Sequence, residues 1–136
     1  MDKEDIALRI GPISPAIPGP LYQQIITGFK REIGEDRLVA GTALPSFRLL
    51  AEQLLVSVIT VKRAYEELER EGIIYRRQGL GTYVAEDGLN RSRASKLENA
   101  EKLIREALLE VRESGLSPKE TKQFVERIVT SILNQK

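Results

Sequence analysis

The sequence predicts a mainly α-helical protein that carries one small β-hairpin. The chain has 136 residues, which is about one ordinary domain with a short appendage. Charged residues make up 30% of it and aromatic residues only 5%, a balance more typical of packed helices than of a thick β-sandwich. Apolar residues recur at helical intervals along most of the chain, and strand-like runs are confined to residues 73–85.

The first segment, residues 1–19, is predicted to be an extended arm. Four of the six prolines lie between Pro12 and Pro20, and proline favours extended or turn conformations. From Pro20 the pattern becomes helical, with apolar residues at every fourth position: Leu21, Ile25, Phe29 and Ile33. Pro20 suits a first helical turn and Gly34 suits a helix end, so a helix is predicted over residues 20–33.

Two further helices, joined by a short turn, are predicted next. Pro45 and Ser46 provide a rigid entry and a capping hydroxyl for a helix over residues 47–54. Ser57 can cap a third helix, which ends near Gly72. The inward stripe of this third helix consists of Val61, Ala64, Tyr65 and Leu68.

A β-hairpin is predicted after the third helix. The runs Ile73–Arg77 and Thr82–Ala85 read as short strands on either side of a glycine-rich turn. Three helices followed by a hairpin is the element order of a winged helix-turn-helix, which we assign to residues 20–85.

The C-terminal part is predicted to be a helical hairpin over residues 95–136. Residues 86–94 are polar and lack periodicity, so they are predicted to form a linker. A narrow apolar seam follows, at Leu97, Ala100, Ile104, Ala107 and Val111. Ser117 and Glu120 make a capping box around a proline, which marks the start of a second amphipathic helix over residues 118–133.

The composition argues against several classes of protein. The chain contains no Cys and no His, which removes disulfides, zinc fingers and imidazole bases, and we predict no enzyme activity, no cofactor and no metal site. The net charge of +1 is uninformative about binding to phosphate. No apolar run approaches the roughly 20 residues that span a bilayer, and the acidic start Met1–Asp5 is unlike a signal peptide, so we predict a cytoplasmic protein without a membrane partner.

The third helix has the composition of a DNA-reading helix in its first two turns. Ile59 and Arg63 are predicted to point outward, with Thr60 and Lys62 beside them. An exposed Ile59 would suit contact with a thymine methyl group, and the alternative is that it packs beside the turn. The rest of the helix carries acidic residues, at Glu66, Glu67 and Glu69. These would repel phosphate, so DNA contacts are expected only in the first half of the helix.

The tip of the hairpin is locally cationic. Arg76, Arg77 and Gln78 precede Gly79, and no acid lies within residues 73–85. We expect this wing to contact DNA phosphate or the minor groove. The alternative is a solvated hairpin in which one of the two arginines pairs with a nearby glutamate.

An ordered series of segments extends beyond these separate signals. It consists of PLYQQI at 20–25, GTALPSFR at 41–48, LAEQL at 50–54, VSVITVKRAYEELE at 56–69 and EGIIYRRQGLGTYV at 71–84. The series closely resembles the DNA-binding domain of GntR-family bacterial transcription regulators. The string Ser57–Thr60 resembles the short, YtrA-like members, which lack the large effector domains of other branches.

The resemblance implies DNA contacts at the positions that match the family pattern: Arg48, Ser57, Thr60, Lys62 and Gly79. The chain departs from the pattern at two places. Val58 stands where many members have an arginine that reads a base, and Leu55 stands where many have glycine in the turn. Valine cannot make the bidentate contact of arginine to guanine, although it can touch a thymine methyl group.

The predicted C-terminal helices carry more apolar surface than a hairpin can bury, at Leu97, Ile104, Leu108, Val111, Phe124, Ile128 and Ile132. The resemblance implies that a second copy covers this surface, in a twofold homodimer that reads a pseudo-palindromic operator. The alternative is that the two helices fold back onto their own winged domain.

The sequence therefore predicts a sequence-specific regulator, of the repressor type, that binds double-stranded DNA as a homodimer. The resemblance further implies transporter genes as targets, and a small-molecule effector of unknown identity would bind among the C-terminal helices. The alternative function is a winged-helix module for protein–protein contacts without specific DNA binding. The basic residues Lys62, Arg63, Arg76 and Arg77 favour DNA.

Overall fold

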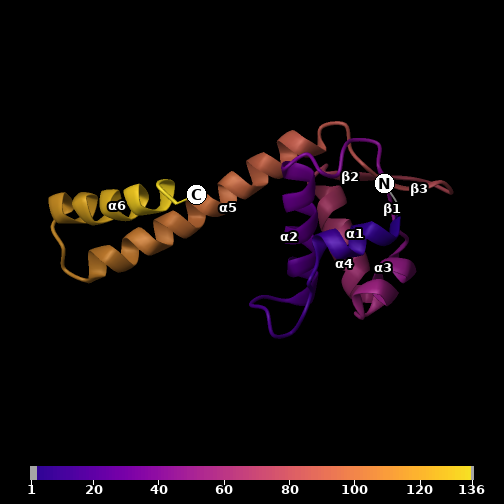
Figure 1. The fold of residues 1–136 in the computed structure, drawn as a ribbon, viewed down its shortest axis with the longest axis horizontal. Coiled ribbons are helices and arrows are strands. Elements are labelled where there is room, and N and C mark those ends of the chain that lie inside the picture. Colours follow the sequence, from indigo (N-terminus) through magenta and orange to yellow (C-terminus); the bar gives the residue numbers. More distant parts are fainter. Residues whose placement is uncertain (1–2, 136) are drawn as a thin grey trace. The chain divides into compact units, whose positions relative to one another are not determined.

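The structure is a computed structural model that describes residues 3–135 (Figure 1). These residues divide into two compact units, with the boundary in the sequence between Lys96 and Leu97. In chain order the elements are α1 (Lys3–Ile10), α2 (Leu21–Gly34), β1 (Ala43–Leu44), α3 (Phe47–Leu54), α4 (Val58–Arg70), β2 (Ile74–Arg77), β3 (Gly81–Val84), α5 (Gly88–Glu113) and α6 (Pro118–Leu133). The helices α2, α3 and α4, followed by the β2–β3 hairpin, confirm the predicted winged helix-turn-helix.

The core of the first unit is built around Tyr65 of α4. Helices α2 and α4 lie side by side (Figure 1). The Phe29 ring of α2 meets the Tyr65 ring edge-on, with centroids 5.6 Å apart. Phe47, the first residue of α3, packs edge-on against the same ring at 5.2 Å. The buried Tyr65 hydroxyl donates a hydrogen bond to the Pro45 carbonyl at 2.8 Å, and burial raises the pKa of this phenol. Tyr65 thus holds the beginning of α3 against α4.

A three-stranded antiparallel sheet, in the order β1-β3-β2, forms the wing. In the hairpin Arg76 lies opposite Thr82 and Arg77 lies opposite Gly81. The two-residue strand β1 pairs with β3 and had no sequence signal, because the segment around Leu44 has neither the length nor the alternation of a strand.

The N-terminal segment differs from the prediction, since the extended arm is wrong for Lys3–Ile10, which form α1. Ile6, Ala7 and Ile10 are fully or almost fully buried against the first unit. A Cβ atom at Gly28 of α2 would lie only 2.4 Å from the Ile10 carbonyl oxygen, so this glycine permits the close approach of the two helices. The helix is stabilised by this tertiary contact, whereas its own sequence has too short an apolar pattern to predict it. Residues 1 and 2 lie outside the described residues.

The proline-rich residues 11–20 contain neither helix nor strand, as expected. The buried amide of Gln24 organises them: it accepts a hydrogen bond from the Ser14 amide at 2.9 Å and donates to the carbonyls of Ser14, Ile17 and Gly19. One side chain of α2 therefore satisfies the backbone of a segment that cannot form its own ladder.

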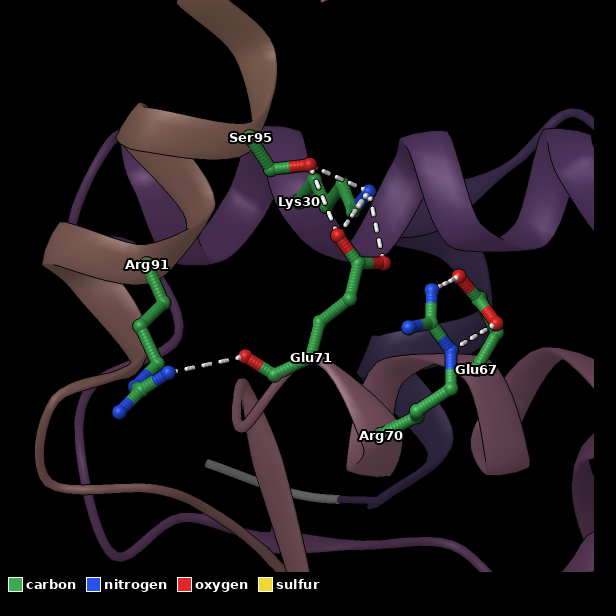
Figure 2. A network of polar contacts seen from close by, with 6 residues as sticks. All are labelled: Lys30, Glu67, Arg70, Glu71, Arg91 and Ser95. Atoms are coloured by element: carbon green, nitrogen blue, oxygen red, sulfur yellow. Dashed lines mark hydrogen bonds and ion pairs between the residues drawn. The ribbon is translucent and has the colours of Figure 1, made fainter. Parts of the chain in front are cut away.

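The predicted linker over residues 86–94 is also wrong, because α5 already begins at Gly88. Polar contacts hold its first turns to the rest of the first unit. The Ser95 hydroxyl donates to the Glu71 carboxylate at 3.0 Å and accepts from Lys30 at 2.7 Å (Figure 2). Lys30 also pairs with the Glu71 carboxylate, at 3.0 Å. The Arg93 guanidinium donates to the Gly34 carbonyl at 2.9 Å. The first turns of α5 carry no apolar stripe, so hydrophobic periodicity in the sequence could not predict that they are helical.

The second unit consists of the C-terminal part of α5 and all of α6. Ser117 and Glu120 form the predicted capping box, and the bonds to Ser117 lower the pKa of the Glu120 carboxyl. No residue from Leu97 to Gln135 is buried. Among residues 3–135, no helix combines the length and the apolar character needed to cross a bilayer.

Candidate nucleic-acid interface

The turn between α3 and α4 is held by two serine caps. The Ser46 hydroxyl accepts a hydrogen bond from the Leu49 amide at 3.1 Å, and the Ser57 hydroxyl accepts from the Thr60 amide at the same distance. Between them, Leu55 adopts a left-handed conformation (φ 59°) with its side chain 91% exposed. The turn thus has the backbone geometry that favours glycine, which the family pattern often has here.

The first turns of α4 present a mixed apolar and basic surface. Ile59 is 79% exposed and Val58 is 41% exposed, so the alternative that Ile59 packs beside the turn is wrong. Lys62 is exposed, and it has no ion pair with any acid whose side chain the structure describes. Arg63 differs from Lys62, because its guanidinium stacks over the Tyr22 ring of α2 at 3.8 Å from the centroid.

The acids of the second half of α4 are partly neutralised within the protein. Arg70 donates to the Glu67 carboxylate with its Nε at 2.9 Å, and this bond lowers the pKa of Glu67 (Figure 2). Glu71, directly after the helix, is paired with Lys30. Glu66 and Glu69 are exposed. In the N-terminal half of the helix, Lys62 is by contrast a cation without an acidic partner in the described part of the chain.

The wing and the beginning of α3 share one groove. Ser46 and Phe47 line it from α3, and Arg76, Arg77 and Gly79 line it from the hairpin, around a volume of about 330 Å³. The Arg76 guanidinium lies 5.0 Å from the centroid of the Phe47 ring. The lining contains no acid, and within the described part of the chain neither wing arginine forms an ion pair. The alternative in which one of them pairs with a glutamate is therefore wrong.

The remaining expected contact residues are also accessible. Gln78 and Gly79 are exposed in the hairpin turn, where Gly79 has a positive φ of 76°, and Arg48 is exposed on the first turn of α3. The structure thus brings the wing arginines to the start of α3, but it turns Arg63 towards α2. From the sequence alone, Tyr22 and Phe47, whose rings lie beside Arg63 and Arg76, were missed, because an aromatic residue on the inner face of a helix is predicted to be core.

The residues expected to dimerise lie in the second unit and remain accessible to different extents. Leu97, Ile104 and Ile132 are more than half exposed, at 72%, 58% and 57%. Leu108 and Ile128 are exposed to 36% and 44%. Val111 and Phe124 are half-buried.

Comparison with known proteins agrees with this geometry. Residues 21–84, which cover α2 to β3, match the family model described as bacterial regulatory proteins, gntR family. A solved structure of a GntR family transcriptional regulator from Listeria monocytogenes is 33% identical, covers 81% of this chain and 96% of its own, and superposes with a TM-score of 0.64. The chain belongs to the GntR family. It is a transcription regulator with the DNA-binding domain of that family.

Within the GntR family, the chain is similar to the short YtrA-like members over most of its length. It is 29% identical to the HTH-type transcriptional repressor YtrA of Bacillus subtilis, over 88% of this chain and 92% of that protein. The structure of YtrA from Sulfolobus acidocaldarius, a GntR-family transcription factor, is 27% identical and covers 90% of this chain and 98% of its own, with a TM-score of 0.51. The match to the regulator YhdI of Bacillus subtilis is shorter: it is 46% identical and covers 49% of this chain and 14% of YhdI.

Proposed function

We propose that this GntR regulator binds an operator as a homodimer, with the first turns of α4 in the major groove and the wing on the DNA backbone. The observation that carries this proposal is the set of unpaired cations around the helix-turn-helix. Lys62 on α4 and Arg76 and Arg77 on the wing form no ion pair with any acid in the described part of the chain. Cations left free in this way can each replace a counterion on phosphate.

The groove between α3 and the wing supports a phosphate contact there. It is lined by two arginines and by the start of a helix, both of which favour a negative charge, and the described lining has no acid to compete. Arg48, exposed on the first turn of α3, adds a further cation. These contacts would position the protein on the duplex, and the side chains of α4 would then reach the base edges.

The homodimer is supported by the exposed apolar surface of the second unit. Helix α6 has no buried residue, although it carries Phe124, Ile128 and Ile132 on one side. Each apolar side chain left in water costs about 1.5–3 kcal/mol relative to burial, which a unit of this size cannot sustain for several residues. An apolar groove of about 680 Å³ lies between α5 and α6 and is lined by Leu108 and Val125 among others. The exposed apolar surface of the second unit of another copy could pack into this groove.

Repression is the proposed sign of regulation, by similarity to the repressor YtrA. The resemblance to YtrA-like regulators also suggests transporter genes as targets and the bacterial cytoplasm as the place of action. A small-molecule effector, where one exists, would act on the second unit, since the first unit is occupied with DNA contacts.

The proposal is tested with the full-length chain and duplexes selected from a random library. We expect a few related sequences with twofold symmetry to be enriched, and the affinity for them to fall steeply as salt is raised. Sedimentation at the same protein concentration should give a dimer. Enrichment of no sequence at all would disprove DNA readout, and a monomer that binds the symmetric site fully would disprove the dimer.

A further inference from the structure

Contacts inside the protein engage some of the α4 side chains, so fewer of them are free to reach bases. In a helix-turn-helix, the bases are contacted mainly by the first turns of the second helix. Thr60 is engaged there: its Oγ1 lies 2.7 Å from the Ser57 Oγ, which in turn accepts a hydrogen bond from the Thr60 amide at 3.1 Å. The Thr60 hydroxyl is therefore directed towards Ser57 at the helix end, and this hydrogen bond competes with a contact to a base.

Arg63 is also engaged. Its guanidinium stacks on the Tyr22 ring at 3.8 Å and lines a groove with Glu66 and Glu67 of its own helix. This groove lies between α4 and the beginning of α2. Arg70 also lines it and pairs with Glu67, so Glu66 is the acid that disfavours a phosphate close to Arg63. Arg63 is thus held on the side of α4 that faces α2.

Three side chains of the first two turns remain free, and two of them are apolar. Val58 is 41% exposed and Ile59 is 79% exposed, whereas Lys62 is the free cation beside them. The edges of bases in the major groove are hydrogen-bonding groups with one apolar exception, the 5-methyl group of thymine. Exposed β-branched side chains at the groove-facing start of α4 match that methyl group and no other feature of the major groove.

We propose that Val58 and Ile59 determine the operator sequence by contacting thymine 5-methyl groups. Lys62 is the one basic side chain in the first two turns of α4 that remains free to bind DNA beside them. This inference rests on the proposed DNA-binding function and deepens it. Each half-site then carries thymine opposite the first turn of α4, and the contact discriminates by shape and desolvation rather than by a bidentate hydrogen bond.

The test removes only the methyl groups. Duplexes are first selected by the full-length chain from a random library, and each thymine of the selected sequence is then replaced by deoxyuridine, which pairs identically but lacks the 5-methyl group. We expect one or two positions in each half-site at which the replacement weakens binding about fourfold, and thymines outside the half-sites at which it has no effect.

Variants then connect the methyl groups to the two side chains. Ile59→Ala and Val58→Ala are expected to weaken binding to the thymine operator and to lose the difference between thymine and deoxyuridine at the position that each side chain contacts. Both residues are exposed, so the fold should remain, and the thermal unfolding midpoint checks this. Leu55→Asn is the matched control, because Leu55 is an exposed apolar residue that lies in the turn and outside α4. It should retain the full methyl effect.

The outcomes separate this inference from the proposed function. Specific binding with equal affinity for thymine and deoxyuridine at every position would overturn the methyl readout alone. A methyl effect that persists unchanged in both alanine variants would also overturn it. Failure to select any sequence, together with Ile59-dependent binding to a protein, would overturn specific DNA binding itself and favour a protein-interaction surface.

Discussion

The hydroxyl group of Tyr65 donates a hydrogen bond to the carbonyl oxygen of Pro45 at 2.8 Å, in the core between the recognition helix and the entry of α3. This bond joins α4 to the beginning of α3, the two elements that carry proposed DNA contacts. Tyr65 lies on the inner side of α4, and Pro45 directly precedes Ser46, the residue that caps α3 and lines the wing groove. The relative position of the two surfaces proposed to contact DNA is thus set by a buried contact.

Replacing Tyr65 by phenylalanine should therefore weaken both stability and DNA binding. The variant leaves the buried Pro45 carbonyl without a partner, and we expect a loss of about 1–2 kcal/mol in the free energy of unfolding. Urea denaturation measures it. Tyr83→Phe is the matched control, since the Tyr83 hydroxyl donates to the Leu80 carbonyl in an exposed position, and its cost should stay below about 0.5 kcal/mol. Equal losses for the two variants would contradict the role of Tyr65.

Arg48→Ala and Lys62→Ala should each weaken operator binding without unfolding the protein. A base contact is worth about 1–3 kcal/mol, a loss of roughly 5- to 150-fold, and a lost phosphate contact lowers the salt slope by about one. Binding isotherms at several salt concentrations distinguish the two cases. Lys119→Ala, an exposed cation at the start of α6, serves as control. The assigned docking is incorrect when both variants bind as tightly as the parent chain.

Reversing the charge of the wing, by Arg76→Glu and Arg77→Glu together, should reduce the affinity for operator DNA and for unrelated DNA by a similar factor. Contacts to the backbone position the protein but carry little sequence information. Competition assays with both kinds of duplex give the two factors. A loss confined to the operator would mean that the wing reads bases instead.

Truncation after Lys96 should give a folded monomer with a greatly reduced operator affinity. It keeps the contacts of Ser95 and Arg93 with the first unit and removes the proposed dimer surface. Loss of the tether between half-sites is expected to cost on the order of 10²- to 10⁴-fold in affinity. Sedimentation and binding isotherms check both parts. A shorter chain that ends after Gly88 is the comparison: it lacks the polar contacts of α5 and should unfold at a lower temperature. A Lys96-terminated chain that remains dimeric would refute the dimer surface.

Acid should destabilise the first unit through Glu32. Its carboxylate accepts a hydrogen bond from the Arg37 Nε at 3.0 Å, and this bond keeps the pKa of Glu32 below its ordinary value. Because the pKa of Glu32 is lower in the folded protein than in the unfolded chain, its ion pair stabilises the fold at pH values above the ordinary pKa of glutamate. This stabilisation is lost as the pH falls from the ordinary pKa to the pKa of Glu32 in the folded protein. Glu32→Gln should therefore be less stable than the parent at pH 7, with a difference that shrinks as the pH falls below the ordinary pKa of glutamate. Thermal unfolding across this range measures it, and a difference independent of pH would contradict the ion pair.

Much of this architecture was predictable because its signals are local. The repeat of apolar residues through Leu21, Phe29 and Ile33, the caps Ser46 and Ser57, and the glycine-rich turn at Gly79 each depend on near neighbours in the chain. Local signals also placed the free cations of the interface on α3, α4 and the wing. The residues that form the DNA-binding fold were thus identified, and so was the family that the chain resembles.

The features that only the tertiary structure could reveal depend on contacts between residues that are distant in the sequence. Helix α1 forms where Ile10 packs directly against the backbone of Gly28, and the first turns of α5 are held where Ser95 contacts Glu71 and Lys30. The same holds at the interface. Lys62 and Arg63 are adjacent cations in the sequence, yet only Arg63 is held by a ring, that of Tyr22, 41 positions earlier in the chain. A pattern of residues determines which face of a helix is available, but the packing of its neighbours decides which side chains on that face are free to bind.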